Sequence, residues 1–271
     1  MAIAKIYWKL PFKFFRIIYK FKNREIIDKN LRFTSHGKLI LVTDKNSKQS
    51  KIFLAKRERL HLYWHGIDSR LEQIAKQYIL EQVPSLASGT GWIIDIGANI
   101  GEFSLALKNS YKRNEFIMIE PSVGEHTAAV QNMQGTDCRI FCTGLWYKET
   151  KIPFYHANET GDSSLLPRDY SRPNDLILVR TLDSLLSEMN VSEIDLLKLE
   201  AEGAEPEVLL GAEKTLKITK YITADLGPER GVKQLRVYKQ CHALLLKSGF
   251  EEISRYEGMR EVYLFKNTKF S

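Results

Sequence analysis

From Gly91 onward, short apolar runs alternate with stretches of helical periodicity, and this alternation most constrains the fold. We expect strands at 92–96, 115–119, 139–146, 194–199 and 221–224, and helices at 101–110, 123–134, 206–217 and 234–248. Such alternation predicts a mostly parallel sheet covered on both faces. Two further apolar runs, 253–256 and 261–266, have no helix between them and predict an antiparallel edge hairpin. The expected fold class is α/β, with a doubly wound, Rossmann-like sheet.

The glycine-containing string Asp95-Ile96-Gly97-Ala98-Asn99-Ile100-Gly101 lies between an expected strand and an expected helix. Gly97 permits a tight turn, and Gly101 lets the helix start approach a ligand, whose polar atoms can meet free backbone N–H groups. The string lacks the third glycine of the dinucleotide-binding G-x-G-x-x-G motif. It also lacks the Gly-Lys-Ser/Thr of a phosphate-binding loop, so a phosphate site is not indicated.

Glu120 follows the second strand, 25 residues after Asp95. In a doubly wound sheet, an acid at this place points into the crevice where the strand order reverses and can accept hydrogen bonds from ribose hydroxyls. An acid suits an adenosine with free 2′ and 3′ hydroxyls. Together with the Asp95–Gly101 string, Glu120 indicates S-adenosyl-L-methionine, a cofactor that needs no phosphate grip.

At this point the chain resembles the FkbM family of methyltransferases over about residues 56–266. The resemblance rests on residues 94–101, 119–121, 181–183 and 194–205. It implies the class I methyltransferase fold and methyl transfer to oxygen, often of a sugar or polyketide hydroxyl. Carried across, the residues expected to bind the cofactor are Asp95, Gly97, Ala98, Asn99, Gly101 and Glu120. Weaker candidates for the adenosine end are Ser122, Thr143 and Gly144.

The family usually has Asp where this chain has Glu200, so the carboxylate lies one methylene further out. An alkyl hydroxyl loses its proton as it attacks, and a positioned base helps. Candidate bases are the acids that follow the fourth and fifth strands, in the order Glu200, Asp225, Glu202. These acids also fit a solvated loop and helix start. Glu200 with Asp225 is an alternative Mg²⁺ site, although no metal is assigned.

Two histidines, His126 and His156, are weaker candidate bases by chemistry alone. His126 is expected on an exposed helix face, and His156 lies in an insertion spanning residues 151–180. Within that insertion, residues 161–165 are expected to form part of a lid over the methyl acceptor.

The first 24 residues carry seven basic residues and no acid, whereas residues 25–271 carry 33 of each sign. On a helical wheel, Ile3, Ile6, Tyr7, Leu10, Phe14, Ile17, Ile18 and Phe21 share one sector, and lysines with Arg16 share the opposite one. Pro11 interrupts the pattern. No apolar stretch is long enough for a signal peptide or a membrane span. An interfacial membrane helix and a helix packed on protein remain the main alternatives, with RNA contact less favoured.

The expected organisation is a basic helix at 1–24, a β hairpin and helix subdomain at 25–90, and a methyltransferase domain at 91–271. A capping box, Ser69 with Glu72, predicts a helix over 69–82. Residues 84–91 are expected to form a loop at the domain boundary. The three cysteines, Cys138, Cys142 and Cys241, are an odd number and contain no C-x-x-C pair. This pattern favours reduced thiols and a cytoplasmic protein.

The charge-neutral body argues against nucleic acid as a partner. As the resemblance to the FkbM family implies, a glycan or lipid-linked sugar is the expected acceptor. Whether the chain forms a homodimer remains open. Two other functions remain open: a non-catalytic module that keeps the fold, and an RNA methyltransferase.

Overall fold

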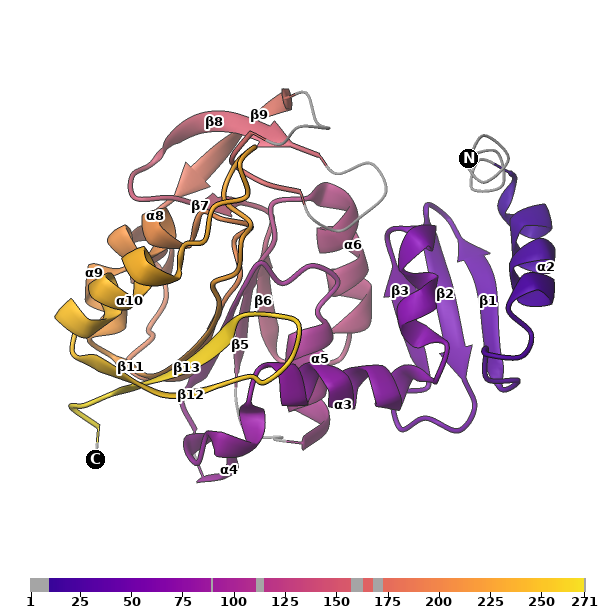
Figure 1. Ribbon diagram of the computed structural model, residues 1–271, viewed down its shortest axis with the longest axis horizontal. Coiled ribbons are helices and arrows are strands. Elements are labelled where there is room, and N and C mark those ends of the chain that lie inside the picture. Colours follow the sequence, from indigo (N-terminus) through magenta and orange to yellow (C-terminus); the bar gives the residue numbers. More distant parts are fainter. Residues whose placement is uncertain (1–9, 89, 111–114, 157–162, 168–172, 271) are drawn as a thin grey trace.

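A seven-stranded sheet forms the centre of the molecule in a computed structural model that describes residues 10–88, 90–110, 115–156, 163–167 and 173–270 (Figure 1). Its strand order is β12-β13-β11-β10-β4-β5-β6. The strands are β4 (Trp92–Ile96), β5 (Phe116–Ile119), β6 (Cys138–Phe141), β10 (Ile194–Leu199), β11 (Thr219–Asp225), β12 (Phe250–Arg255) and β13 (Val262–Asn267). β13 runs antiparallel to the other six strands, which are parallel to one another. This is the expected class I methyltransferase fold, confirmed with its edge hairpin.

Helices cover both faces of this sheet, because alternate strand residues point to opposite sides. One core contains Ile93, Phe116 and Leu196 and packs under α5 (Glu102–Ser110) and α6 (Val123–Asn132). The other core contains Ile94, Ile117 and Leu197. It packs under α7 (Leu182–Ser187), α8 (Glu205–Leu210), α9 (Glu213–Leu216) and α10 (Tyr238–Lys247). The central strands are buried on both sides, which explains their uninterrupted apolar character.

Two expected elements are divided. The strand expected at 139–146 ends at Phe141, and Gly144–Leu145 (β7) joins a second sheet with β9 (Pro173–Arg180) and β8 (Thr150–Tyr155). The helix expected at 206–217 breaks at Gly211, where a Cβ would lie 2.3 Å from the carbonyl oxygen of Trp146. A second helix then starts anew, because the carboxylate of Asp183 accepts the N–H groups of Lys214 and Thr215.

Before the main domain lie β1 (Leu31–His36), β2 (Leu39–Asp44) and β3 (Lys51–Leu54), an antiparallel sheet whose first strand was not expected. Two 3₁₀ helices, η1 (Arg57–Tyr63) and η2 (Leu80–Gln82), flank α3 (Ile67–Gln77). The expected capping box at Ser69 is wrong. The helix starts at Ile67, whose N–H donates to Asp44 Oδ2 at 3.1 Å. A short helix, α4 (Ser85–Ser88), occupies the expected loop.

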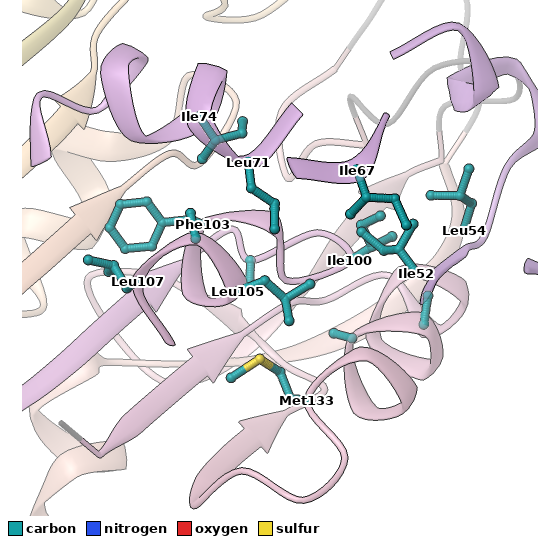
Figure 2. Packing of buried hydrophobic residues seen from close by; sticks show 14 of the residues in the cluster. Ile52, Leu54, Ile67, Leu71, Ile74, Ile100, Phe103, Leu105, Leu107 and Met133 are labelled. Atoms are coloured by element: carbon teal, nitrogen blue, oxygen red, sulfur yellow. The ribbon is translucent and has the colours of Figure 1, made fainter. Parts of the chain in front are cut away.

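This N-terminal unit shares its hydrophobic core with the main domain. Leu71 and Ile74 of α3 face Phe103 of α5, and Ile67 lies beside Ile52 and Ile100 (Figure 2). On α6, the Asn132 side chain bonds both the N–H and the carbonyl of Phe53 in β3, as well as the carbonyl of Ile100. The layer that covers this face of the central sheet is therefore built from both parts of the chain.

The helix α2 (Phe12–Lys22) begins directly after Pro11 and packs beside β1 (Figure 1). Phe15 and Tyr19 of this helix are buried, and Tyr19 contacts Phe33 with its ring centroid 6.0 Å away. The first nine residues of the expected leader lie outside the described residues. Within the described part of the chain, every helix is too short or too polar to cross a membrane.

Candidate functional site

A cavity of about 390 Å³ opens where β4, β5 and β10 end. This edge of a doubly wound sheet is the usual ligand-binding place. The cavity also takes lining residues from η1 and α3, so both parts of the chain form its wall. The expected site residues that line it are Gly97, Ala98, Asn99, Glu120, Thr143, Gly144, Glu200 and Glu202.

The loop after β4 is pressed against the end of β10. Gly97 adopts φ 71°, and a Cβ on it would lie 1.9 Å from the carbonyl oxygen of Glu200. Glycine is needed here because two backbone segments touch. Asn99 follows with φ 51°, a left-handed conformation that asparagine tolerates. This loop therefore holds the ends of β4 and β10 together at the cavity floor.

Three of the expected cofactor residues support the cavity from outside its lining. Asp95 is fully buried, accepts a hydrogen bond from the Ser104 hydroxyl at 2.8 Å, and lies 3.3 Å from the Lys198 ammonium. Gly101 adopts φ 89°, and a Cβ there would lie 3.0 Å from Met118 Cε, so it serves packing. The Ser122 N–H donates to Glu120.

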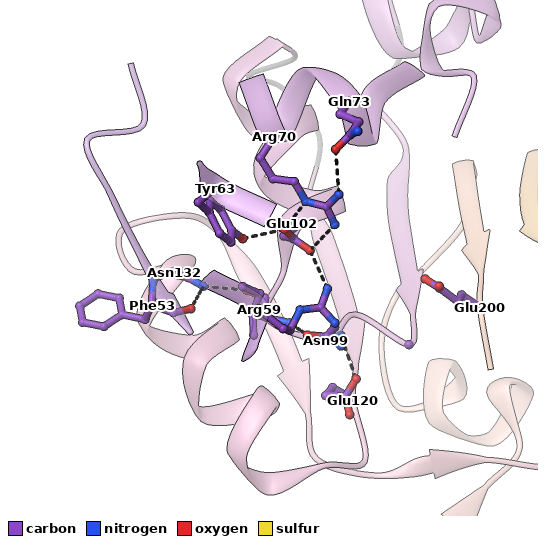
Figure 3. Close-up of polar contacts among 12 residues, drawn as sticks. Phe53, Arg59, Tyr63, Arg70, Gln73, Asn99, Glu102, Glu120, Asn132 and Glu200 are labelled. Carbon is purple, nitrogen blue, oxygen red and sulfur yellow. Dashed lines mark hydrogen bonds and ion pairs between the residues drawn. The ribbon is translucent and has the colours of Figure 1, made fainter. Parts of the chain in front are cut away.

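Glu120 is a buried carboxylate that lines the cavity. Its Oε2 accepts a hydrogen bond from the N–H of Asn99 at 2.8 Å (Figure 3). Its Oε1 accepts one from the N–H of Ser122, also at 2.8 Å. Burial raises the pKa of Glu120 to about 7, against the lowering effect of these backbone donors. Each oxygen has one such donor, so the carboxylate can still accept bonds from two ligand hydroxyls.

Glu200, the first-ranked candidate base, lies in a cluster of donors. Its Oε2 accepts a hydrogen bond from the Tyr78 hydroxyl at 2.6 Å and lies 3.0 Å from the Lys198 ammonium. Its Oε1 lies 2.5 Å from Arg260 Nη1. Burial acts to raise the pKa of Glu200, but the charges of Lys198 and Arg260 outweigh it and hold the pKa well below its usual range.

Asp225, the second candidate, lies behind the cavity lining and is 2% exposed. Its Oδ2 shares Arg260 Nη1 with Glu200, at 2.9 Å. Burial and the neighbouring charge of Glu200 raise the pKa of Asp225 to about 6. The two carboxylates of the alternative Mg²⁺ site do lie together, but a guanidinium bridges them. The described residues contain no group of three or more His, Cys, Asp or Glu side chains placed to hold a metal ion.

The third candidate, Glu202, lines the cavity from the loop between β10 and α8 and adopts φ 53°. This loop is held by Glu205, whose Oε1 accepts the N–H groups of Ala201 and Gly203. Burial raises the pKa of Glu205 to about 7. The buried Glu205 thus fixes the segment that carries both candidate acids into the cavity.

Two arginines of the N-terminal unit share one carboxylate at the cavity wall, an arrangement that the sequence did not reveal. Arg70 bonds both oxygens of Glu102, at 2.7 and 3.1 Å, and Arg59 Nη2 lies 3.3 Å from Oε2 (Figure 3). The Tyr63 hydroxyl donates to the same group. Burial acts to raise the pKa of Glu102, but Arg70 and Arg59 lower it to about 2. Arg59, Arg70 and Glu102 together carry one net positive charge.

The histidine candidates lie outside the lining. His126 is 3.4 Å from the carbonyl of Ile140, and His156 pairs with Asp175 at 3.4 Å. Of the expected lid at 161–165, the first two residues lie outside the described residues, whereas Ser163 and Leu165 line the cavity. The cavity thus combines a buried carboxylate that can accept further hydrogen bonds, apolar surface, an acidic strand end and two arginines that share one carboxylate.

Comparisons with known proteins identify methyltransferases as similar proteins. Residues 95–226 match the family model described as the methyltransferase FkbM domain. The methyltransferase sdnD of Sordaria araneosa is 26% identical, over 59% of this chain and 73% of its own length. The 2-O-methyltransferase NoeI of Sinorhizobium fredii is also 26% identical, over 65% and 79%. Among solved structures, magnesium protoporphyrin IX methyltransferase from Synechocystis, with bound SAM, has a TM-score of 0.43, 10% identity, and coverage of 74% and 79%.

Proposed function

Because residues 95–226 form a methyltransferase FkbM domain, we propose that the chain transfers a methyl group to a hydroxyl oxygen of a sugar, on a glycan or a lipid carrier. The family and fold imply S-adenosylmethionine as the methyl donor. When bound, it supplies an electrophilic methyl carbon on a positively charged sulfur. Transfer to oxygen is supported by the acidic end of β10 and by the similarity to a relative named as a 2-O-methyltransferase.

Glu120 is the observation that carries this proposal. Its buried carboxylate, with room for two hydroxyl donors, suits a ribose at the point where the strand order reverses. Ile119, Leu145 and Phe154 supply apolar lining for an adenine ring. The guanidiniums of Arg59 and Arg70 in the cavity wall suit the carboxylate of the donor's amino acid end. The residues present therefore fit this cofactor.

Two of the candidate acids divide the work on the acceptor hydroxyl. Glu200 faces the cavity as a carboxylate and would accept the hydrogen bond of the hydroxyl, which orients the oxygen for attack. A general base works best when its pKa lies near the working pH, and the pKa of Asp225, about 6, meets that condition better than that of Glu200. Arg260 joins the two carboxylates, so the proton would pass to this pair as a unit.

The acceptor can be tested with methyl-labelled S-adenosylmethionine and three substrates: a free oligosaccharide, a polyprenyl-phosphate-linked sugar and a transcribed RNA. We expect label in a base-stable ether on a sugar. At saturating S-adenosylmethionine, the rate should rise with pH through about 6, because only the ionised pair can take the proton. Asp225→Asn should abolish this rise, whereas Glu188→Gln, which changes a surface pair with Arg180, should keep it. Label in RNA, or in none of the three, would refute the proposal.

A further inference from the structure

The helix α2 packs on the protein through its aromatic side and not through the aliphatic sector of the amphipathic pattern. Its buried residues are Phe15 and Tyr19, from the aromatic border of the wheel. Arg57 lies over the ring of Phe15, at 5.1 Å from its centroid, and donates to the carbonyl of Leu10 at 2.8 Å. Trp64 donates to the Tyr19 hydroxyl at 2.6 Å. The helix is thus anchored to β1 and η1 through its aromatic side.

Two basic residues that a helical wheel places opposite the aliphatic sector also serve this anchoring. Arg16 Nη1 donates to the carbonyl of Phe33 at 3.2 Å, and the Lys20 ammonium donates to the carbonyl of Leu31 at 2.6 Å. Both carbonyls belong to β1, the edge strand of its sheet. Edge strands with open carbonyls invite pairing with other chains, and these two side chains cover that edge.

As a consequence, the aliphatic and aromatic stripe of the helix points away from the protein. Phe14, Ile17 and Phe21 are 58, 58 and 69% exposed. At 100° per residue they fall within an arc of about 60°, roughly opposite the side that packs. Ile26, just beyond the helix, is 48% exposed. Single exposed apolar residues are ordinary, but a stripe of large ones on one helix face marks a binding surface.

The charge around this stripe selects its partner. Residues 10–55 hold 11 basic and 3 acidic residues, whereas residues 56–271 hold 27 and 30. Lys13 and Arg24, on and just after the helix, are exposed, and the Arg24 guanidinium lies 5.3 Å from the Phe21 ring centroid. A second copy of so basic a unit would be repelled, whereas an anionic surface would be attracted.

We propose that the outward face of α2, defined by Phe14, Ile17 and Phe21, docks on an anionic lipid bilayer. An apolar stripe flanked by basic side chains binds such an interface without crossing it. Arg57 ties α2 to η1, and the next residues of η1, Glu58 and Arg59, line the cavity. Docking would therefore hold the cavity wall near the lipid surface, where a lipid-linked acceptor is found.

Flotation of the full chain with vesicles tests this proposal. One set contains phosphatidylcholine alone. The other contains phosphatidylcholine with about 30% phosphatidylserine, which mimics an anionic membrane leaflet. The test variant is F14S/I17S/F21S. The matched control is L176S/L178S/L246S, which removes residues that are 67, 55 and 50% exposed elsewhere. All six side chains are exposed, so both variants should fold.

The wild type and the control should float with the anionic vesicles, and the test variant should bind at least about tenfold more weakly. Lys13→Gln with Arg24→Gln should weaken binding to anionic vesicles and leave the weak binding to neutral vesicles unchanged. Equal flotation of the wild type and the test variant would overturn the proposal. So would a lipid-free dimer that the same three substitutions dissociate, because a second copy would then be the partner.

Discussion

Removing the carboxylate that Arg59, Arg70 and Tyr63 share tests how the N-terminal unit is held on the main domain. Glu102→Gln keeps the shape of the side chain but leaves two largely buried guanidiniums without a counter-charge. Breaking a buried pair on one side costs about 3–5 kcal/mol. The pKa of Glu102, lowered from 4.5 to about 2, corresponds to about 3 kcal/mol at neutral pH. Both routes give the same magnitude.

For a chain of this size, such a loss lowers the melting temperature by about 6–12 °C. Calorimetric melting at pH 7 should show this drop in Glu102→Gln. The control Glu188→Gln, which breaks a surface ion pair with Arg180, should change the melting temperature by less than about 2 °C. A carboxyl group whose pKa is lowered by folding stabilises the fold at pH values above its pKa in the unfolded chain. That stabilisation is lost as the pH falls toward its pKa in the folded protein.

The gap between wild type and Glu102→Gln should therefore shrink to less than about half at pH 3. A gap of equal size at pH 7 and pH 3, or no gap at pH 7, would refute the reasoning.

Three further substitutions test the site itself. Arg260→Gln removes a charge that lowers the pKa of Asp225, so the acidic limb of the kcat/KM profile should move to higher pH; an unmoved limb contradicts the pairing. Gly97→Ala places a Cβ 1.9 Å from the carbonyl oxygen of Glu200 and should lower the melting temperature by more than about 5 °C, and a smaller drop would show that the loop can shift. Tyr78→Phe removes one hydrogen-bond donor to Glu200, which costs about 1 kcal/mol of stability. The melting temperature should therefore fall only slightly, and a large fall would contradict this assignment.

The central sheet could be predicted from sequence because its strands are short apolar runs with no competing signal. The strands expected at 92–96 and 194–199 match β4 and β10 at both ends. Errors arose where a contact distant in sequence decides the local structure. Nothing near Gly211 shows that the carbonyl of Trp146 lies against it, and Asp44 caps α3 from another element.

The candidate site could be predicted where residues follow strands, and not where it depends on packing between distant segments. Glu120 and Glu200 were placed because the carboxyl ends of parallel strands meet at one edge. Arg59 and Arg70 were missed, since only the packing of η1 and α3 on α5 brings them to Glu102. In α2, periodicity grouped the residues of each face correctly but could not say which face meets the protein.

Calorimetric titration with S-adenosylmethionine, for the wild type and Glu120→Gln between pH 6 and 8, tests the central claim most directly. If Glu120 binds ribose hydroxyls, wild-type affinity should rise about tenfold over this range, as the carboxyl with a pKa of about 7 ionises. The Gln variant should bind at least about tenfold more weakly than the wild type at pH 8, with no such rise. No binding by the wild type, or equal affinity and equal pH dependence in both proteins, would contradict the account.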